Sequence, residues 1–228
     1  MTQKIRLSDL DKADTVDRYS KRYREFGYSP KALGWDKGKQ DIRFDVLTSL
    51  YNCKDKTILD IGCGFGDMNK TLMARCPDQY RYIGIDLVPE LIHEARQRYA
   101  NDSVRFIEGD FMAVDIDEAP NFAIASGTFN HKLKNTDNYA LIEAAMSRAF
   151  TLCSDGFAFD FLSDKVDYPL THTFHAAPER ILSLAYQFSR NVVLRNDYMP
   201  FEFSMFVFKD ASFLAEDTVF NRHKELRG

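Results

Sequence analysis

From Thr57 onward, the chain alternates short runs of β-branched and aromatic residues with longer stretches of helical periodicity. This alternation predicts a parallel sheet with helices on both of its faces. The expected strands are TILDI (57–61), YIGIDL (82–87), VRFIE (104–108), FAIAS (122–126), GFAFDFL (156–162), NVVLRNDY (191–198) and EFSMFVFK (202–209). The expected helices between the first five strands cover 66–76, 89–99 and 138–152.

The end of the chain departs from this alternation. Only Met199 and Pro200 separate the last two strand-like runs, which predicts a tight hairpin. Parallel strands cannot be joined by so short a connection, so the last strand is expected to be antiparallel. The fold class that follows is α/β, with a Rossmann-like, seven-stranded, mostly parallel sheet, an antiparallel last strand and helices on both faces. A dinucleotide-binding Rossmann domain normally continues in parallel instead.

The segment that precedes the sheet has helical periodicity in two pieces, 15–26 and 40–51, joined by the turn-rich GYSPKALGWDKGK. We expect this segment to pack beside the strand ends as an N-terminal helical lid. With 228 residues, of which 45% are apolar, the chain is long enough to bury one sizeable core. The expected parts are the lid (1–56), the sheet domain (57–210) with a substrate-side insertion (164–177), and a C-terminal tail (211–228).

Composition argues against several kinds of protein. The formal net charge is −4 and the basic residues are not gathered in one block, which disfavours a nucleic-acid partner. No run of about eighteen apolar residues occurs and the N-terminus is charged throughout, so we expect no membrane partner and a cytoplasmic location. Cys53, Cys63, Cys76 and Cys153 are widely spaced and form no CxxC pair. We therefore expect reduced thiols, no zinc site and no disulfide framework.

The segment ILDIGCGFGD (58–67) carries the strongest signal of a site, because an apolar strand runs into a glycine-rich turn and then a helix. Glycine is needed where the backbone turns sharply and a ligand approaches it closely. The pyrophosphate of a nicotinamide or flavin nucleotide would sit at such a helix N-terminus. Here, however, Asp60 ends the strand and Asp67 opens the helix, and two carboxylates would repel a pyrophosphate. S-adenosylmethionine has no phosphate but carries an ammonium and a sulfonium, which carboxylates attract.

Two further acids stand at the ends of the next two strands. Asp86 follows the glycine turn by about twenty residues, the usual place for an acid that accepts both ribose hydroxyls. Asp110 is placed to accept the adenine amino group, with Leu87 or Phe111 covering the faces of the ring. Each acid alone is equally an ordinary turn former at a strand end. Acids at three successive strand ends converge on one crevice, however, and this favours a binding site.

Across residues 57–209 the sequence resembles the class I S-adenosylmethionine-dependent methyltransferases. The glycine motif of that family matches 60–66, and its reversed terminal hairpin matches 191–209. Its ribose acid matches Asp86 and its adenine acid matches Asp110. The resemblance implies S-adenosyl-L-methionine as the cofactor. It also implies that the cofactor contacts come from the glycine turn and the strand ends, namely Asp60, Gly62, Cys63, Gly64, Asp86, Leu87, Asp110, Phe111, Ser126 and Gly127.

A narrower resemblance, to a set of bacterial class I methyltransferases without a settled substrate, rests on ALGWDKGKQDIRF, ASGTFN and VVLRNDYMPFEFSMFVFK. It implies that the loop in the thirties lies over the cofactor, with Trp35 and Gln40 as contacts. Trp35 is equally well explained as a buried anchor for the N-terminal helices. Tyr19, Tyr23 and Tyr28 either line the acceptor pocket or anchor a helix, and the sequence does not rank these roles.

The fourth strand leads into ASGTFNHK (125–132), where methyltransferases usually hold the acceptor. The Asn/Asp-Pro-Pro-Tyr/Phe motif of amide and adenine N-methyltransferases is absent, as is the cysteine after a proline that cytosine C5 enzymes require. Ser126, Thr128 and Asn130 do not reproduce the Asp, Asp, Asn set that holds magnesium in catechol-type O-methyltransferases. We therefore expect no metal.

Methyl transfer from a sulfonium mainly requires that the acceptor be aligned and that a proton be removed from it. His131 directly follows the fourth strand and is expected at the mouth of the crevice, where it is either the base or a solvated loop residue. His172 and His175 are further candidates for catalysis. They lie in the insertion after the fifth strand, which we expect to be the substrate-specificity loop.

These features predict an S-adenosylmethionine-dependent methyltransferase that acts, without a metal, on an oxygen or nitrogen of a small polar metabolite such as a sugar, a sugar nucleotide or a biosynthetic intermediate. The expected partner is this small-molecule acceptor, and the expected state is a monomer or homodimer. A non-catalytic S-adenosylmethionine-binding sensor or partner subunit is the alternative, because its binding residues would look alike.

Overall fold

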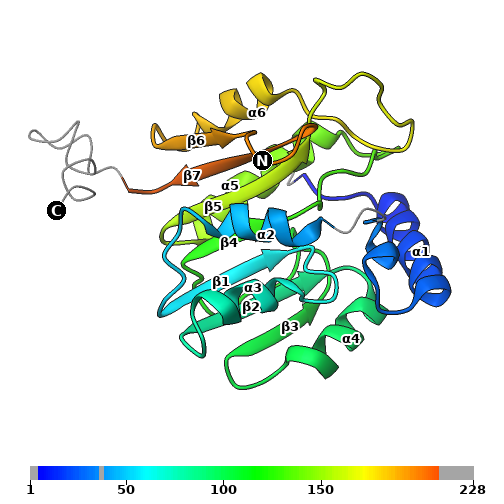
Figure 1. Cartoon of the computed structure of the whole chain (residues 1–228). Coiled ribbons are helices and arrows are strands. Elements are labelled where there is room, and N and C mark those ends of the chain that lie inside the picture. The colour runs from blue at the N-terminus through cyan, green and yellow to red at the C-terminus, as the bar shows by residue number, and fades with distance from the viewer. Residues whose placement is uncertain (1–4, 36–38, 211–228) are drawn as a thin grey trace, which may run out of the picture.

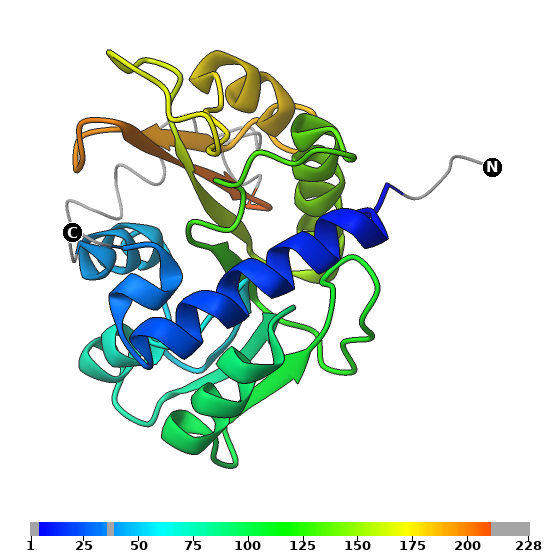
Figure 2. The same ribbon diagram turned by 90° about the vertical axis from the view of Figure 1, so that its right-hand side faces the viewer.

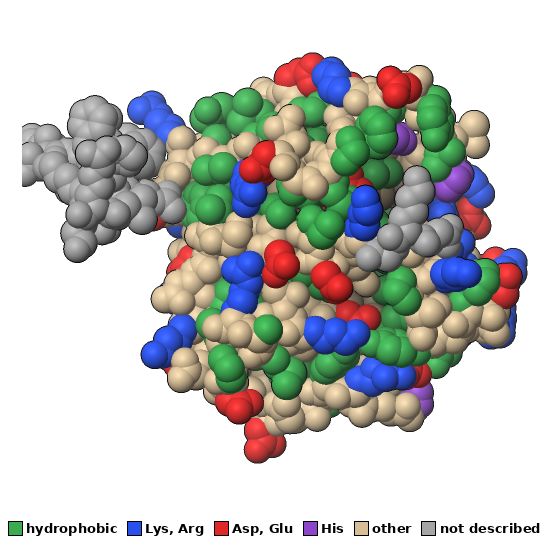
Figure 3. Space-filling view, viewed as in Figure 1, with side chains coloured by type: hydrophobic (Ala, Val, Ile, Leu, Met, Phe, Trp, Pro, Cys, Tyr) green, Lys and Arg blue, Asp and Glu red, His purple; other side chains and the backbone are tan. Residues whose placement is uncertain are grey.

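The computed structural model describes residues 5–35 and 39–210. The expected C-terminal tail (211–228) lies outside these residues, as do residues 36–38 of the turn-rich N-terminal segment. Within the described ranges, every helix is too short or too polar to cross a lipid bilayer. On the face shown in Figure 3, basic and acidic side chains are interspersed and neither sign forms a continuous block.

The sheet has seven strands in the order β3-β2-β1-β4-β5-β7-β6 (Figure 1). Strands β1 to β5 pair in parallel, and β7 is antiparallel to both of its neighbours, β5 and β6. The predicted fold class and the reversal at the end of the chain are therefore confirmed. The strands are β1 (Lys56–Ile61), β2 (Tyr80–Asp86), β3 (Val104–Glu108), β4 (Phe122–Ala125), β5 (Gly156–Leu162), β6 (Val192–Arg195) and β7 (Glu202–Phe208).

Helices cover both faces of this sheet. Successive strand residues point to opposite sides, so apolar residues on both sides need helices to pack against. In β1, Ile58 packs with apolar side chains of α2, α3 and α4, whereas the next residue, Leu59, packs with those of α5 and α6. The helices are α1 (Asp9–Phe26), the short 3-10 helix η1 (Pro30–Leu33), α2 (Gln40–Thr48), α3 (Met68–Arg75), α4 (Pro89–Tyr99), α5 (Asn138–Leu152) and α6 (Pro178–Ala185).

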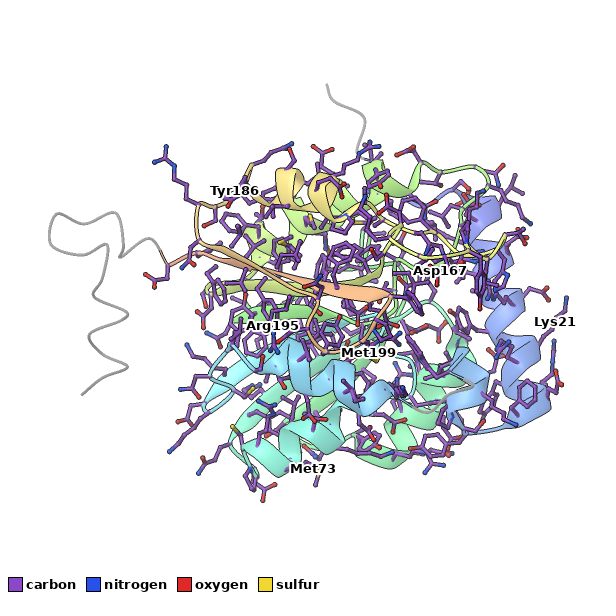
Figure 4. The ribbon with its side chains drawn as sticks, turned by 45° about the horizontal axis from the view of Figure 1, so that its top comes forward. Lys21, Met73, Asp167, Tyr186, Arg195 and Met199 are labelled. Atoms are coloured by element: carbon purple, nitrogen blue, oxygen red, sulfur yellow. The ribbon has the colours of Figure 1, made fainter. Side chains whose placement is uncertain are left out.

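The connection between β6 and β7 is longer than the sequence predicts. We expected a two-residue turn at Met199 and Pro200, but β6 ends at Arg195 and residues 196–201 form the connection (Figure 4). The guanidinium of Arg195 donates through Nε and Nη2 to the two carboxylate oxygens of Asp197, each at 3.0 Å. Pro200 has no N–H to offer a neighbouring strand. These two features accompany the end of the β6–β7 pairing at Arg195. The predicted hairpin is present, but the prediction of a two-residue turn was wrong.

Helix α1 lies across the carboxyl ends of the parallel strands (Figure 2). It begins at Asp9, earlier than predicted, because Ser8 is an N-cap whose hydroxyl accepts from the N–H of Asp11 at 3.1 Å. Near the other end of the helix, Ser20 donates to Glu90 of α4 at 2.9 Å. Lys21 points away from the body on the outer side of the helix (Figure 4). The inner side of α1 therefore covers the space at the carboxyl ends of the parallel strands.

Candidate active site

A pocket lies at the carboxyl ends of β1 to β4, beneath α1 and the segment from η1 to α2. All of the predicted cofactor contacts line it, namely Trp35, Gln40, Asp60, Gly62, Cys63, Gly64, Asp86, Leu87, Asp110, Phe111, Ser126 and Gly127. The N-terminal segment supplies further lining residues that the sequence did not single out, among them Leu7, Thr15, Leu33 and Phe44. The carboxyl ends of parallel strands share one sheet edge, and this brings the motifs together.

The glycine-rich turn after β1 fixes the orientation of the Asp86 carboxylate. Gly64 has a φ of +54°, which favours glycine, and its N–H donates to Oδ2 of Asp86 at 2.8 Å. The N–H of Val88 donates to Oδ1 of the same carboxylate at 2.9 Å. Burial raises the pKa of Asp86 from its usual value, and these backbone N–H groups oppose the rise. The carboxylate is thus held in one orientation at the pocket wall.

Asp60 is the most deeply buried acid in the pocket wall, with 3% of its surface exposed. The hydroxyl of Tyr82 donates to its Oδ2 at 2.6 Å. Burial raises the pKa of Asp60 to about 7; the hydrogen bond from Tyr82 opposes the rise, and the nearby Asp86 and Asp160 add to it. A bound cation beside this carboxyl would favour its ionised form.

With Asp60 as the expected partner of the S-adenosylmethionine ammonium, this shifted pKa predicts a pH dependence for cofactor binding. The pKa of Asp60 is about 7 in the free protein, and a neighbouring cation lowers it in the complex. Affinity is then full above pH 7 and is lost as the pH falls through 7, because a proton must leave before the cation binds. We expect binding to weaken about eightfold between pH 7.5 and pH 6.0, as measured by calorimetry. Asp60→Asn should remove this dependence; a variant that keeps it would assign the dependence to another group.

Asp67 does not line the pocket, contrary to our expectation that it would stand with Asp60 against a pyrophosphate. Its Oδ1 accepts from the hydroxyls of Tyr28 and Tyr99, both at 2.6 Å, and lies 3.0 Å from Nζ of Lys70. Asp67 therefore ties the N-terminal segment to α3 and α4, and the argument against a pyrophosphate rests on Asp60 alone.

The three tyrosines of the N-terminal segment, unranked by the sequence, have different positions. Tyr19 lines the pocket. Tyr23 donates to Glu94 of α4 at 2.6 Å, and Tyr28 bonds to Asp67. Tyr19 is therefore the tyrosine available to a ligand, and the other two anchor the segment against the sheet domain.

Asp110 at the end of β3 is paired with α1. Its Oδ1 accepts from the N–H of Met112 at 2.9 Å, and its Oδ2 lies 2.9 Å from Nζ of Lys12. Lys12 was not predicted at the pocket, since nothing in the local pattern of a charged helix distinguishes this lysine from its neighbours. A carboxylate offers about four lone-pair positions, so Asp110 retains acceptor capacity for a further donor.

The segment at the end of β4 is held by a buried carboxylate that the sequence analysis left without a role. Asp160 of β5 is 1% exposed and accepts from the N–H of Gly127 at 2.6 Å and from the hydroxyl of Ser126 at 2.8 Å. The sequence signal was present, because an acid in the middle of the otherwise apolar run GFAFDFL needs a buried partner.

Trp35 lines the pocket and is also held in place by neighbouring residues, while its contact with the cofactor stays a prediction. The guanidinium of Arg43 stacks on its indole at 3.4 Å from the ring centroid. The ring also rests against Gly127, whose φ is +69°, and a Cβ at that glycine would lie 2.6 Å from Cζ2 of Trp35. Arg43 is itself buried and forms an ion pair with Glu202 of β7.

The three candidate histidines are not equivalent. Only His131 lines the pocket, and its Nδ1 lies 2.6 Å from Nη1 of Arg18 on α1. Burial lowers the pKa of His131, and the charges of Arg18 and His172 lower it further. His172 is exposed. His175 donates through Nδ1 to the carbonyl of Ser163 at 2.7 Å, and its Nε2 lies 2.9 Å from the hydroxyl of Thr173.

The insertion (164–177) does not line the pocket, although we expected it to contact the substrate. Its backbone pairs with neighbouring loops, through bridges between Thr173 and His131 and between Ala176 and Ser163. It therefore supports the segment that carries His131. Among the described residues, no group of three or more His, Cys, Asp or Glu side chains is arranged to hold a metal ion.

Comparison with known proteins identifies the family. The model of a methyltransferase domain family matches residues 58–150. A Mycobacterium tuberculosis protein classed as a methyltransferase is 32% identical over 159 residues, which cover 67% of this chain and 93% of that protein. The chain belongs to the class I S-adenosylmethionine-dependent methyltransferases. It is thus an enzyme whose cofactor is S-adenosylmethionine.

Two further proteins share a shorter stretch of sequence or the fold with this methyltransferase. A malonyl-[acyl-carrier protein] O-methyltransferase of Acetivibrio thermocellus is 36% identical over 72 residues, which cover 32% of this chain and 25% of that enzyme. The crystal structure of magnesium protoporphyrin IX methyltransferase from Synechocystis with bound SAH matches with a TM-score of 0.63 and 14% identity, over 89% of this chain and 97% of that one. At this level of identity, the similarity to the Synechocystis structure shows a shared fold.

Proposed function

We propose that this methyltransferase transfers a methyl group to an oxygen or nitrogen of a small polar metabolite without a metal. The observation that carries the proposal is that the pocket continues past the strand-end acids to His131, Asn138 and Leu141. This extension offers room for a second ligand beside the cofactor. The relative from Acetivibrio thermocellus is by name an O-methyltransferase, which supports an oxygen acceptor.

The residues present suit S-adenosylmethionine. We propose that Asp86 accepts the ribose hydroxyls and Asp110 the adenine amino group, with Leu87 and Phe111 against the ring. The buried carboxyl of Asp60 suits the ammonium, and no described lysine or arginine lines the pocket to repel a cation. When bound, the cofactor supplies an electrophilic methyl group on a sulfonium. The chain's own residues then need to orient the acceptor and exclude water.

A non-catalytic sensor or partner subunit is the less favoured alternative, because the chain belongs to a family of enzymes and its pocket is larger than the set of cofactor contacts. Of the candidate histidines, we propose that His131 assists transfer. His172 and His175 do not line the pocket, so they act, if at all, by supporting the His131 loop.

Incubation with isotopically labelled cofactor and a metabolite extract tests the proposal. We expect label to appear in small molecules, as followed by mass spectrometry, and we expect a chelator to leave the rate unchanged. Absence of any transferred label from a protein that binds the cofactor would favour the sensor, and loss of transfer on chelation would refute metal independence.

We further propose that residues 1–56 act as a lid over the cofactor. Trp35 is the only tryptophan of the chain and lies against the pocket, so its fluorescence should change when S-adenosylmethionine binds. Proteolytic cleavage between residues 28 and 40 should slow at the same time, because a closed segment opens less often. NAD, added at the same concentration, should have neither effect. Identical spectra and identical cleavage with and without cofactor would refute the lid.

A further inference from the structure

We propose that Lys12 of α1 makes cofactor binding selective for the adenine amino group, because its ammonium holds the Asp110 carboxylate in the orientation that accepts this group. The inference deepens the proposed cofactor contacts and rests on the assignment of Asp110 to adenine. Lys12 shares the inner face of α1 with Thr15 and Tyr19, which line the pocket. Lys12 itself does not line the pocket, so it acts through Asp110 as a positioning residue.

The loop after β3 fixes the backbone and one carboxylate oxygen of Asp110. The carbonyl of Asp110 accepts from the N–H groups of Ala113 at 2.8 Å and Val114 at 2.9 Å. Its Oδ1 accepts from the N–H of Met112 at 2.9 Å. The carboxylate therefore stands on an ordered turn, and its remaining freedom is set by what lies beside Oδ2.

Lys12 occupies the side of Oδ2. Its Nζ lies 2.9 Å from that oxygen, and 4.0 Å from the exposed carboxylate of Asp9. Oδ2 is buried and receives no hydrogen bond from residues 5–35 and 39–210, so the contact with Lys12 is ionic and lies outside hydrogen-bonding angles. Asp110 lines the pocket with a side chain that is 11% exposed. Since Oδ2 is buried, Oδ1 is its polar atom on the pocket side.

Oδ1 is the acceptor that this arrangement presents. A carboxylate oxygen has two lone pairs, and the N–H of Met112 uses one of them. The second is open to a donor such as the amino group of adenine. If the carboxylate turned, this lone pair would move away from the base. The ion pair with Lys12 opposes such a turn, because it holds Oδ2 in place.

The charge of Lys12 matters because adenine is neutral. Asp60 is expected to meet the ammonium of the cofactor, which brings its own positive charge. Asp110 is expected to meet an uncharged base, which excludes water from the carboxylate without compensating it, and this is costly. Among the cations that the structure describes, Lys12 is the one that forms an ion pair with Asp110. It therefore supplies the counter-charge that the ligand lacks.

Helix α1 is anchored at both ends without Lys12. Near its start, the N–H of Ser8 donates to the hydroxyl of Thr136 at 3.0 Å. Near its other end, the hydroxyl of Ser20 donates to Glu90 at 2.9 Å. These contacts hold α1 across the strand ends (Figure 2). Replacement of Lys12 should thus change the adenine site without undocking the helix.

Binding of two ligands that differ in one group tests the proposal. SAH, and its analogue in which hydrogen replaces the adenine amino group, are titrated by calorimetry into the wild type and Lys12→Met. The wild type should bind SAH about 10- to 150-fold more tightly than the analogue, the range for a hydrogen bond to a charged group. Lys12→Met, which keeps the apolar stem, should lower this preference about fivefold, the upper end for a partly exposed ion pair. The loss should fall on SAH, with the affinity for the analogue unchanged.

Two further variants are the controls. Lys12→Arg keeps a cation beside Asp110 and should retain most of the preference. Lys21→Met is the matched control, because Lys21 lies on the same helix, points away from the body and pairs with Asp17 at the surface (Figure 4). It should bind both ligands as the wild type does. An equal loss of affinity for both ligands in Lys12→Met would show a structural effect on α1 and overturn the proposal, as would an unchanged preference.

Asp110→Ala separates this inference from the assignment on which it rests. This variant should bind SAH and the analogue equally. A preference that survives in Asp110→Ala would remove Asp110 from the adenine contact, and the role of Lys12 with it. A preference that is lost in Asp110→Ala but intact in Lys12→Met would keep the adenine contact and overturn the role of Lys12 alone. Neither result depends on methyl transfer, which the labelled cofactor tests separately.

Discussion

Glu202→Ala is expected to lower the free energy of unfolding by about 3–5 kcal/mol, because it leaves a buried arginine without its counter-ion. Arg43 is 3% exposed and Glu202 is 8% exposed. Two nitrogens of the guanidinium bond to the carboxylate, and its Nη1 has no hydrogen-bond partner among residues 5–35 and 39–210. Asp160 lies 4.0 Å from Nε of Arg43 but already accepts from Gly127 and Ser126, so it compensates only in part.

Chemical denaturation of the purified variant measures this loss. Glu179→Ala is the matched control, because Glu179 also pairs with a cation, Lys165, but on the surface, and its loss should leave stability unchanged. The double variant Arg43→Met with Glu202→Leu should recover most of the stability, since it removes both charges and keeps an apolar filling. A loss in Glu202→Ala no larger than that of the control would show that water reaches Arg43.

Asp86→Ala is expected to weaken S-adenosylmethionine binding by about 1.5–3 kcal/mol, or roughly 10- to 150-fold, the range for charge-assisted hydrogen bonds. Two effects contribute. The proposed bonds to the ribose hydroxyls are lost, and the N–H groups of Gly64 and Val88 lose the acceptor that orders the turn. Because the second effect disturbs the glycine turn, we expect a value near the upper end.

Calorimetry with S-adenosylmethionine and with SAH measures the change. Glu108→Ala is the matched control, since Glu108 is an exposed acid on the neighbouring strand β3, and it should bind the cofactor as the wild type does. NAD should not bind to any of these proteins. An unchanged affinity in a folded Asp86→Ala variant would remove Asp86 from the cofactor site.

Local sequence patterns were enough to predict the order of elements and most of their limits. The helix at 89–99 begins at Pro89, which needs no N–H partner in a first turn, and the structure has α4 at Pro89–Tyr99. The acids and glycines at strand ends could be assigned to one pocket because parallel strands place their carboxyl ends on a common edge. These predictions depend only on residues close in sequence and on a general property of the fold.

The parts that the sequence did not predict depend on partners far apart in the chain. Arg43 and Glu202 are 159 positions apart, and Arg18 and His131 are 113 apart. No local pattern shows which of many arginines meets which carboxylate or imidazole. The same limit explains why His175 was considered for catalysis, although its two ring nitrogens face Ser163 and Thr173.

The sequence alone therefore determined the class of fold, the family and the strand-end residues that line the pocket, because periodicity and strand-end motifs are local. The tertiary structure decided that α1 crosses the pocket, that Asp67 anchors the N-terminal segment and that the lone pair of His131 is occupied by Arg18. Each of these follows from how an amphipathic segment docks on a sheet edge. That docking depends on the combined shape and charge of surfaces built from distant residues.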